Sequence, residues 1–309
     1  MAKYNENRQK PKSTQDRLKG YALKASIKKG LAGTFIYGWL LASLTIILVP
    51  ILWMVSAAFT DTENLNAVPI IPNPARWSLA NYQEIFTYTG STTQALPDYP
   101  RAFLVSLGVA SLSTVLTVIF SSLVGFAFSR YRFKGKKSVL LSMFGLQLFP
   151  SFMGMIALFL LFNQFGWLNS WPHLSLIYVA GSIPFNTFII RGFMKNIPLS
   201  LDESARIDGA SNVQVLRKII IPLAAPILGF VAVDSFMKPW LDYILPSILV
   251  PENETVAMWL FRVNDNESQP YNPMLFMAGG LFIAVPIMMV QIYMQKYVVY
   301  GLTGGAEKG

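Results

Sequence analysis

The stretch "SLDESARIDGAS", residues 200–211, is polar, and a segment apolar enough to cross a membrane lies on each side of it. Ser200 and Glu203 form a Ser-x-x-Glu capping box, in which each side chain satisfies a free backbone N–H at a helix start. The box predicts a helix that begins at about Leu201. Gly209 can adopt the left-handed conformation that ends a helix, so the sequence predicts a sharp turn there.

A second short helix is expected directly after this turn. Ser211 and Gln214 repeat the box as Ser-x-x-Gln, and the helix should continue to Ile219 and end before Pro222, where the next apolar segment begins. Two short helices joined at a sharp turn must project from a membrane. They form either a docking element for a partner or a well-capped loop without one, and local chemistry alone leaves both interpretations open.

The composition is that of an integral membrane protein. Hydrophobic residues make up 53% of the 309 residues and charged residues 13%, whereas soluble domains are about 25% charged. The chain has no cysteine and a single histidine, His173, which excludes disulfides, thiol catalysis and a His/Cys metal cluster. The net charge of +9 lies beside hydrophobic segments, so we interpret it as a signal for membrane orientation and not for nucleic-acid binding.

Six stretches are long and apolar enough to cross a bilayer core of about 30 Å as helices. They are residues 34–59, 102–129, 138–162, 173–193, 222–250 and 274–298. No internal repeat is present, so the sequence predicts one all-α bundle of six transmembrane helices. Residues 34–309 form this single domain, and residues 1–33 form a basic tail.

The distribution of lysine and arginine predicts the orientation. With both termini in the cytoplasm, 21 of the 25 basic residues lie on the inner side and only Arg76, Arg101 and Arg262 lie outside. Such an asymmetry is the positive-inside pattern of multi-pass proteins of the cytoplasmic membrane. Residues 194–221 are then a cytoplasmic loop, and 60–101 and 251–273 are the large external loops.

The sequence "ESARIDGASNVQVLRKIIIPLAAP", residues 203–226, resembles the cytoplasmic signature of bacterial ABC-importer permeases, which is Glu-Ala-Ala, then Gly, then nine residues, then Ile-x-Leu-Pro. Two positions depart from it, Ser204 and Ile221. "PFNTFIIRGFMKNIP" (184–198), "KPWLDY" (238–243) and "YGLTGGAEKG" (300–309) are similar to the carbohydrate-uptake branch, especially the smaller permease subunit of maltose-type importers.

This resemblance implies a type I importer fold in which the helix between spans 4 and 5 couples the permease to an ATPase. The residues that it assigns to coupling are Glu203, Ser204, Ala205, Asp208, Gly209, Ile219 and Pro222. It implies as partners a second permease subunit, two ATP-binding subunits that hold ATP and Mg, an external solute-binding protein, and a sugar or oligosaccharide. The chain lacks the G-x-x-x-x-G-K-[ST] loop, so no cofactor or catalytic site is expected in it.

Charged side chains within the fifth predicted span are the first candidates for a translocation path. Asp234, Lys238 and Asp242 are spaced at i, i+4 and i+8, which places them on one helix face. Charges at membrane depth are costly unless they are paired or hydrated, so they either neutralise one another or line a polar path. Trp240 and Tyr243 lie close by and could stack against sugar rings.

Two proline sites suggest breaks within the spans. Pro184 is expected to break the fourth span, so that Asn186 and Thr187 lie beside a cavity lined by backbone carbonyls. The alternative is that both side chains hydrogen-bond across helices. Pro150 predicts a bend in the third span.

Other functions are less well supported by the residues. A permease for a polyamine or glycerol phosphate is the nearest alternative, although the spans lack the clustered arginines that phosphate would favour. An ion-coupled carrier rests only on Asp234, Lys238 and Asp242. An intramembrane enzyme lacks a Ser/His/Asp set or metal-ligand cluster.

Overall fold

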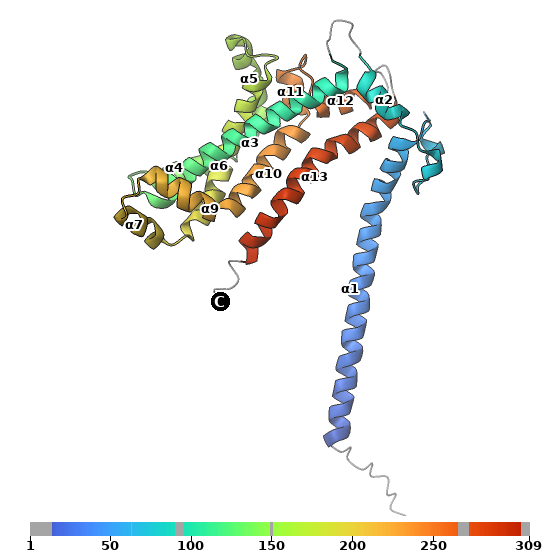
Figure 1. The fold of residues 1–309 in the computed structure, drawn as a ribbon, viewed down its shortest axis with the longest axis horizontal. Coiled ribbons are helices and arrows are strands. Elements are labelled where there is room, and N and C mark those ends of the chain that lie inside the picture. The colour runs from blue at the N-terminus through green and yellow to red at the C-terminus, as the bar shows by residue number, and fades with distance from the viewer. Residues whose placement is uncertain (1–13, 63, 90–95, 149–150, 265–271, 304–309) are drawn as a thin grey trace, which may run out of the picture.

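The computed structural model describes residues 14–62, 64–89, 96–148, 151–264 and 272–303, and these residues are almost entirely helical (Figure 1). The longer helices are α1 (Thr14–Phe59), α3 (Asp98–Arg130), α4 (Lys136–Leu146), α5 (Ser151–Phe165), α6 (Trp171–Lys195), α10 (Ala225–Leu241) and α13 (Pro273–Thr303). The shorter elements are η1 (Leu65–Ala67), η2 (Pro74–Arg76), α2 (Ala80–Thr87), α7 (Leu199–Ile207), α8 (Asn212–Val215), η3 (Leu216–Ile220), α9 (Ile221–Leu223), α11 (Ile244–Leu249) and α12 (Val256–Val263). Pro150, residues 1–13 of the basic tail and residues 304–309 lie outside the described part.

Four described helices are long and apolar enough to cross a membrane by themselves. They are residues 33–59 within α1, all of α3, all of α6, and residues 273–295 within α13. They agree with the first, second, fourth and sixth predicted spans. A fifth crossing is formed if residues 212–223 and α10 are counted as one span with an 80° bend.

The third predicted span, 138–162, is not one helix. It is divided into α4, with 11 residues, and α5, with 15 residues, and neither meets the length needed to cross alone. Pro150 lies in the sequence between the two helices, and proline cannot continue the hydrogen-bond ladder of a helix. The described residues therefore give four or five crossing elements where the sequence predicts six.

Helix α3 lies at the centre of the bundle, where it packs against α6 and α10, and α10 packs in turn against α13. Gly108 faces Trp171 at one end of the α3–α6 contact and Gly125 faces Ile190 at the other, so these two helices run parallel. A Cβ atom on Gly125 would lie 2.8 Å from Ile190 Cγ2. Small residues thus permit the close helix approach that is typical of membrane bundles.

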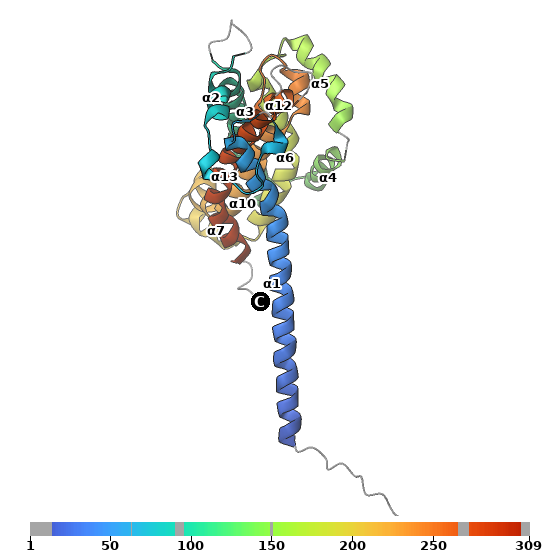
Figure 2. The ribbon, with the colours of Figure 1, turned by 90° about the vertical axis from the view of Figure 1, so that its right-hand side faces the viewer.

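Helix α1 extends far beyond the rest of the bundle (Figure 2). Its 46 residues span about 69 Å at 1.5 Å per residue, and the end nearest Phe59 packs against α13 around Ala57 and Met274. Residues 14–33 continue the helix of the first span without a break. The division between tail and domain at residue 33 stays a prediction.

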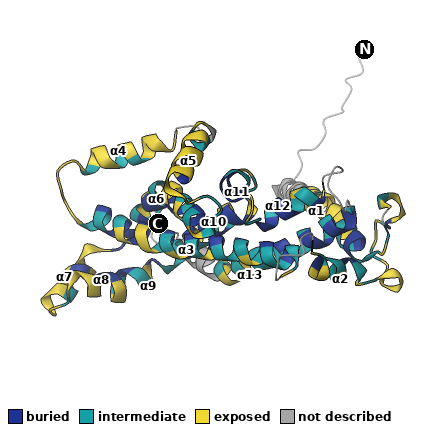
Figure 3. Ribbon diagram, turned by 90° about the horizontal axis from the view of Figure 1, so that it is seen from above, coloured by how far each residue is buried: buried dark blue, intermediate teal, exposed yellow. Residues whose placement is uncertain are grey.

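The two ends of the bundle carry different elements. Helices α7, α8 and α9 lie at one end, and α2 and α12 lie at the other (Figure 3). Because α3 spans the distance between these ends, it contacts α12 near its first residues, and its last residue contacts α7. The predicted cytoplasmic and external loops therefore lie on opposite sides of the molecule.

Candidate functional site

Helix α7 begins two residues earlier than the sequence predicts. Its first residue is Leu199 and its N-cap is Pro198, and no side chain caps it. Ser200 therefore lies within the first turn and does not form the predicted capping box with Glu203. Asp202 in this first turn is paired with an arginine from α3, a contact that the local sequence does not reveal.

The turn after α7 is formed as predicted. Gly209 has φ +84°, its N–H donates to the carbonyl of Arg206, and the N–H of Ala210 donates to the carbonyl of Ala205. The capping box of Ser211 and Gln214 is also present. The Ser211 N–H donates to Gln214 Oε1 at 2.7 Å, and the Gln214 N–H donates to Ser211 Oγ at 3.3 Å.

The helix that follows does not end before Pro222. It continues from α8 through the π-helical turn η3 into α9, which contains Pro222 in its first turn, and the chain then bends by 80° into α10. Pro222 has no N–H to donate to the preceding turn, and α9 ends two residues later at its C-cap Ala224. Val215 and Ile220 are fully buried against α3 and α6, which fixes this segment to the bundle.

The outer face of the α7–α8 pair is exposed and partly apolar. Ile207 is 86% exposed and Val213 is 72% exposed, and apolar side chains at a protruding tip are typical of an interaction surface. A hollow of about 360 Å³ lies between the turn that follows α7 and the helical segment formed by α8 and η3. Its lining residues are Asp208, Gly209, Ala210, Gln214, Lys218 and Ile219. All seven predicted coupling residues are exposed or half-buried, so a partner can reach them.

A buried ion pair anchors α7 to α3. Arg130, the last residue of α3, places Nε 2.8 Å from Asp202 Oδ2, and the two side chains are 3% and 5% exposed. Nη2 of Arg130 also donates to Asp202 Oδ1 and to the carbonyl of Ile197. The sequence contains both charges, but it gives no sign that they meet across 72 positions.

Asp234 and Lys238 form an ion pair on the exposed side of α10. Lys238 Nζ lies 2.7 Å from Asp234 Oδ2, and the side chains are 44% and 24% exposed. The same ammonium lies 5.6 Å from the ring centroid of Phe185 on α6, which is a cation–π contact. The predicted pairing of these two residues is therefore present in the structure.

Asp242 does not share the helix face of that pair. It lies after the end of α10 in an extended conformation, where Oδ1 accepts from the N–H of Ile244 and Oδ2 accepts from the hydroxyl of Tyr178. These bonds replace the helical ladder, so the predicted span 222–250 is interrupted here. Trp240 is fully buried and donates to the carbonyl of Ile283, whereas Tyr243 stacks on Phe261 with ring centroids 4.2 Å apart.

Asn186 and Thr187 are buried inside the bundle and do not line an open cavity. Helix α6 continues through Pro184, which corrects the prediction of a break. Both side chains have no exposed surface, and among the described residues the amide atoms of Asn186 and the hydroxyl of Thr187 have no hydrogen-bond partner. Buried hydroxyl groups without a partner also occur among the described residues of helices that pack on α6: Thr117 and Ser121 on α3, and Ser235 on α10.

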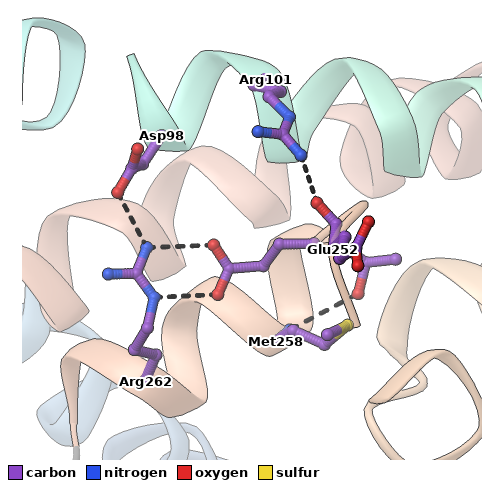
Figure 4. Close-up of polar contacts among 7 residues, drawn as sticks. Asp98, Arg101, Glu252, Met258 and Arg262 are labelled. Atoms are coloured by element: carbon purple, nitrogen blue, oxygen red, sulfur yellow. Dashed lines mark hydrogen bonds and ion pairs between the residues drawn. The ribbon is translucent and has the colours of Figure 1, made fainter. Parts of the chain in front are cut away.

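At the opposite end, ionic contacts hold α12 against the start of α3 (Figure 4). Arg262 Nε and Nη2 lie 2.9 and 3.0 Å from the carboxylate of Glu254, and Nη2 lies 3.1 Å from Asp98 Oδ2. Hydrogen bonds to Glu254 raise the pKa of Arg262, as do the charges of Glu254 and Asp98, although burial acts in the opposite direction. Arg101 donates to the carbonyl of Glu252.

The external segment "VAMWLF" (256–261) packs largely on its own bundle. Trp259 is 2% exposed and lies against Tyr99, with ring centroids 4.7 Å apart. A Cβ on Gly279 would lie 2.6 Å from the Trp259 ring, which shows how closely α12 approaches α13. Phe261 at the end of the segment remains 57% exposed.

Comparison with known proteins relates this architecture to transport. Residues 117–302 match the family described as binding-protein-dependent transport system inner membrane component. The chain is 37% identical to the galactooligosaccharides transport system permease protein GanQ of Bacillus subtilis, over 87% of this chain and 94% of that protein. It is 33% identical to the maltodextrin transport system permease protein MdxG of the same organism, over 85% and 92%.

Solved structures share the fold. One chain of a bacterial ABC transporter involved in the import of the acidic polysaccharide alginate superimposes with a TM-score of 0.68 at 20% identity. The similarity covers 94% of this chain and 99% of that one. A chain of the alginate transporter in complex with a pentasaccharide-bound periplasmic protein gives a TM-score of 0.59 at 17% identity, over 86% and 94%.

Proposed function

The chain belongs to the family of binding-protein-dependent transport system inner membrane components, and from this membership we propose that it is the permease subunit of an ATP-driven importer of a sugar or oligosaccharide. Relatives named for galactooligosaccharides, maltodextrin and trehalose/maltose support the substrate class. The chain is a transport component and not an enzyme; ATP hydrolysis belongs to a separate subunit.

The observation that carries this proposal is the anchored α7–α8 pair. It presents exposed Ile207 and Val213 beside a hollow of about 360 Å³, and its base is tied to α3 by the ion pair of Arg130 and Asp202. Because the α7–α8 pair is anchored to α3, movement of a bound partner can be transmitted through it to the bundle. We propose that the α7–α8 pair is the docking element for an ATPase subunit. The complex contains two such subunits, which bind ATP and Mg, and one of them docks on this chain through Glu203, Ala205 and the surrounding coupling residues.

The ion pair of Asp234 and Lys238 supports a path along the exposed side of α10. A charged pair at membrane depth that is one-quarter to nearly one-half exposed would be costly against lipid tails. This face therefore adjoins a second permease subunit, with a hydrated path for the sugar between the two chains. Tyr243 and Asp242 lie toward its outer end. Trp240, Asn186 and Thr187, which are buried, form the wall behind it.

The outer end bearing α12 is the proposed docking surface for a solute-binding protein. Phe261 is exposed there on a helix whose other side is fixed by Trp259. This assignment places α7 and both termini in the cytoplasm and the chain in a bacterial cytoplasmic membrane, in agreement with the excess of basic residues on the α7 side.

The function can be tested by reconstitution. The chain, co-purified with its permease and ATPase subunits into liposomes, should take up a radiolabelled galactooligosaccharide or maltodextrin when ATP and the cognate binding protein are supplied. Uptake driven by a proton or sodium gradient without ATP would contradict the proposal. ATP-dependent uptake of a polyamine or glycerol phosphate, with no sugar uptake, would contradict the substrate class alone.

Replacing Gly209 with proline should reduce ATP-driven uptake strongly while the protein still inserts. Proline fixes φ near −65°, and Gly209 has φ +84° and donates its N–H to Arg206. The cost is about 1–3 kcal/mol of local strain, which alters the shape of the coupling element. Uptake per assembled complex measures the effect.

The matched control is Gly166→Pro. Gly166 also has a positive φ, +67°, and its N–H donates to the carbonyl of Asn163, but it lies in the connection between α5 and α6, away from α7. It should lose similar local stability and retain uptake per complex. Equal loss of uptake in both variants would show that strain, and not the coupling element, is responsible.

A further inference from the structure

A second hollow, of about 440 Å³, lies at the junction of α3, α4 and α6, separate from the α7–α8 pair. Its lining residues are Phe133, Gly135, Lys136, Lys137, Ser138, Leu140 and Arg191. Three of these are cations and none is an acid. They come from two helices far apart in the sequence, because Lys136 and Lys137 begin α4 and Arg191 lies near the end of α6.

These cations have no carboxylate partner among the described residues. Lys136 Nζ donates to the carbonyl of Tyr131 at 2.9 Å, and Arg191 Nε donates to the carbonyl of Phe128 at 3.3 Å. Partial burial lowers the pKa of Lys136, and the nearby charges of Arg191, Lys195 and Arg132 lower it further. The fold thus gathers like charges that repel one another, and a bound anion would offset this repulsion.

The start of α4 adds backbone donors to the same hollow. Gly135, its N-cap, has φ +83°, no side chain caps the helix, and its first turn contains no acid. The first N–H groups of a helix that have no capping side chain remain available to a ligand. Lysines in this first turn are repelled by the positive end of the helix dipole. A bound anion would therefore lower the electrostatic free energy of this turn.

Exposed apolar side chains continue directly from the charged hollow along α4. Phe133 is 45% exposed, Leu141 is 61% exposed and Phe144 is 51% exposed. A phosphate in the hollow would therefore have a hydrophobic surface within one or two helical turns. The charged hollow is thus followed along α4 by an apolar surface. This arrangement fits the headgroup and acyl chains of a phospholipid better than it fits a soluble anion or an acidic protein.

We propose that this hollow binds the phosphate of an anionic phospholipid from the cytoplasmic leaflet. Lys136, Lys137 and Arg191 contact the headgroup, and the acyl chains lie along α4. The site fastens the α3–α4 connection to the membrane surface, a few residues from Arg130. It requires only that this end of the bundle faces the inner leaflet, so it does not depend on the sugar or on the ATPase.

The test is native mass spectrometry of the complex that contains the full chain, mixed with phosphatidylglycerol or phosphatidylcholine. A basic residue beside an anionic membrane surface contributes a factor of about five in affinity, so Lys136→Gln, Lys137→Gln and Arg191→Gln together should weaken phosphatidylglycerol binding about a hundredfold. Phosphatidylcholine binding should not change. Inorganic phosphate at millimolar concentration should not displace the lipid, because it cannot contact α4.

The matched control is Arg217→Gln with Lys218→Gln, which removes exposed cations from η3 at the same end of the molecule. It should retain lipid binding. A second variant, Lys136→Arg with Lys137→Arg, keeps the charge and should bind normally, which separates lost binding from misfolding.

The proposal would be overturned by equal binding of both lipids, by equal loss in the η3 control, or by displacement of the lipid by inorganic phosphate. Retained lipid with loss of a co-purifying subunit in the glutamine variant would likewise overturn it, in favour of an acidic protein partner.

Discussion

Replacing Arg130 with methionine is expected to abolish ATP-driven uptake and to lower the free energy of unfolding by about 3–5 kcal/mol. The reason is that the carboxyl group of Asp202, whose side chain is only 5% exposed, would be left in a buried site without its charged partner. Without the guanidinium, the first turn of α7 loses its ion pair with α3, and the carbonyl of Ile197 loses its hydrogen-bond donor. Movement of α7 would then no longer be transmitted to the bundle.

Two further variants separate stability from coupling. Arg130→Met combined with Asp202→Leu removes both charges and should regain most of the lost stability, since no orphan charge remains. It should still couple poorly, because apolar contacts lack the directional hydrogen bonds from Arg130 Nη2 to Asp202 and to the carbonyl of Ile197. Arg130→Lys keeps the charge without the fork and should be intermediate.

The measurements are the thermal unfolding midpoint and the sugar uptake per ATP hydrolysed, both normalised to assembled complex. Arg76→Met, which removes an exposed arginine at the other end of the bundle, should change neither quantity. Wild-type uptake per ATP in the Arg130→Met complex would contradict a coupling role for the pair, whatever its effect on stability.

The features predicted correctly from the sequence depend on nearby residues. The turn at Gly209 requires only a residue that tolerates a positive φ, and the box of Ser211 and Gln214 closes within one helical turn. Four spans are recognisable because an uninterrupted apolar run of that length has few other stable states than a membrane helix. Local chemistry decides each of these features, so one sequence is enough to predict them.

The errors arise where a distant residue competes with the local signal. Ser200 and Glu203 satisfy the pattern of a capping box, yet α7 starts at Leu199, and Asp202 in its first turn pairs with Arg130 on α3. Asp242 fits an i+8 position on a helix, yet bonds with Tyr178 and Ile244 end α10 before it. Neither Arg130 nor Tyr178 can be identified as a partner by spacing along the chain, because they lie 72 and 64 positions away.

Pro184 shows the opposite case, in which a strong local signal has no effect. Helix α6 passes through it unbroken, because close packing against α3 holds the helix on both sides of the proline. The same packing encloses Asn186, which the sequence assigns to a cavity. For the proposed polar path, Asp234 and Lys238 are therefore the better candidates, because their charges cannot be placed against lipid without cost.

Replacing Trp259 with alanine is expected to release α12 from the bundle and to abolish stimulation of the ATPase by the external binding protein. Trp259 is 2% exposed and packs against Tyr99 and Gly279, and truncating a buried tryptophan costs about 3–5 kcal/mol. The ion pairs of Arg262 at the end of the helix are partly exposed, with Arg262 itself 33% exposed, and we expect them to contribute too little to retain the helix alone. Hydrogen exchange of the α12 amides should accelerate about a hundredfold or more.

Phe261→Ala distinguishes packing from docking on the same helix. Phe261 is 57% exposed and contacts Tyr243 on its inner side, so its removal should leave the α12 amides protected. If α12 docks the binding protein through this exposed side, Phe261→Ala lowers stimulation while the basal ATPase activity of the complex stays unchanged. If only Trp259→Ala lowers stimulation, α12 is a cover that keeps the bundle closed, and the docking surface lies on η1, η2 and α2 or on the second permease subunit.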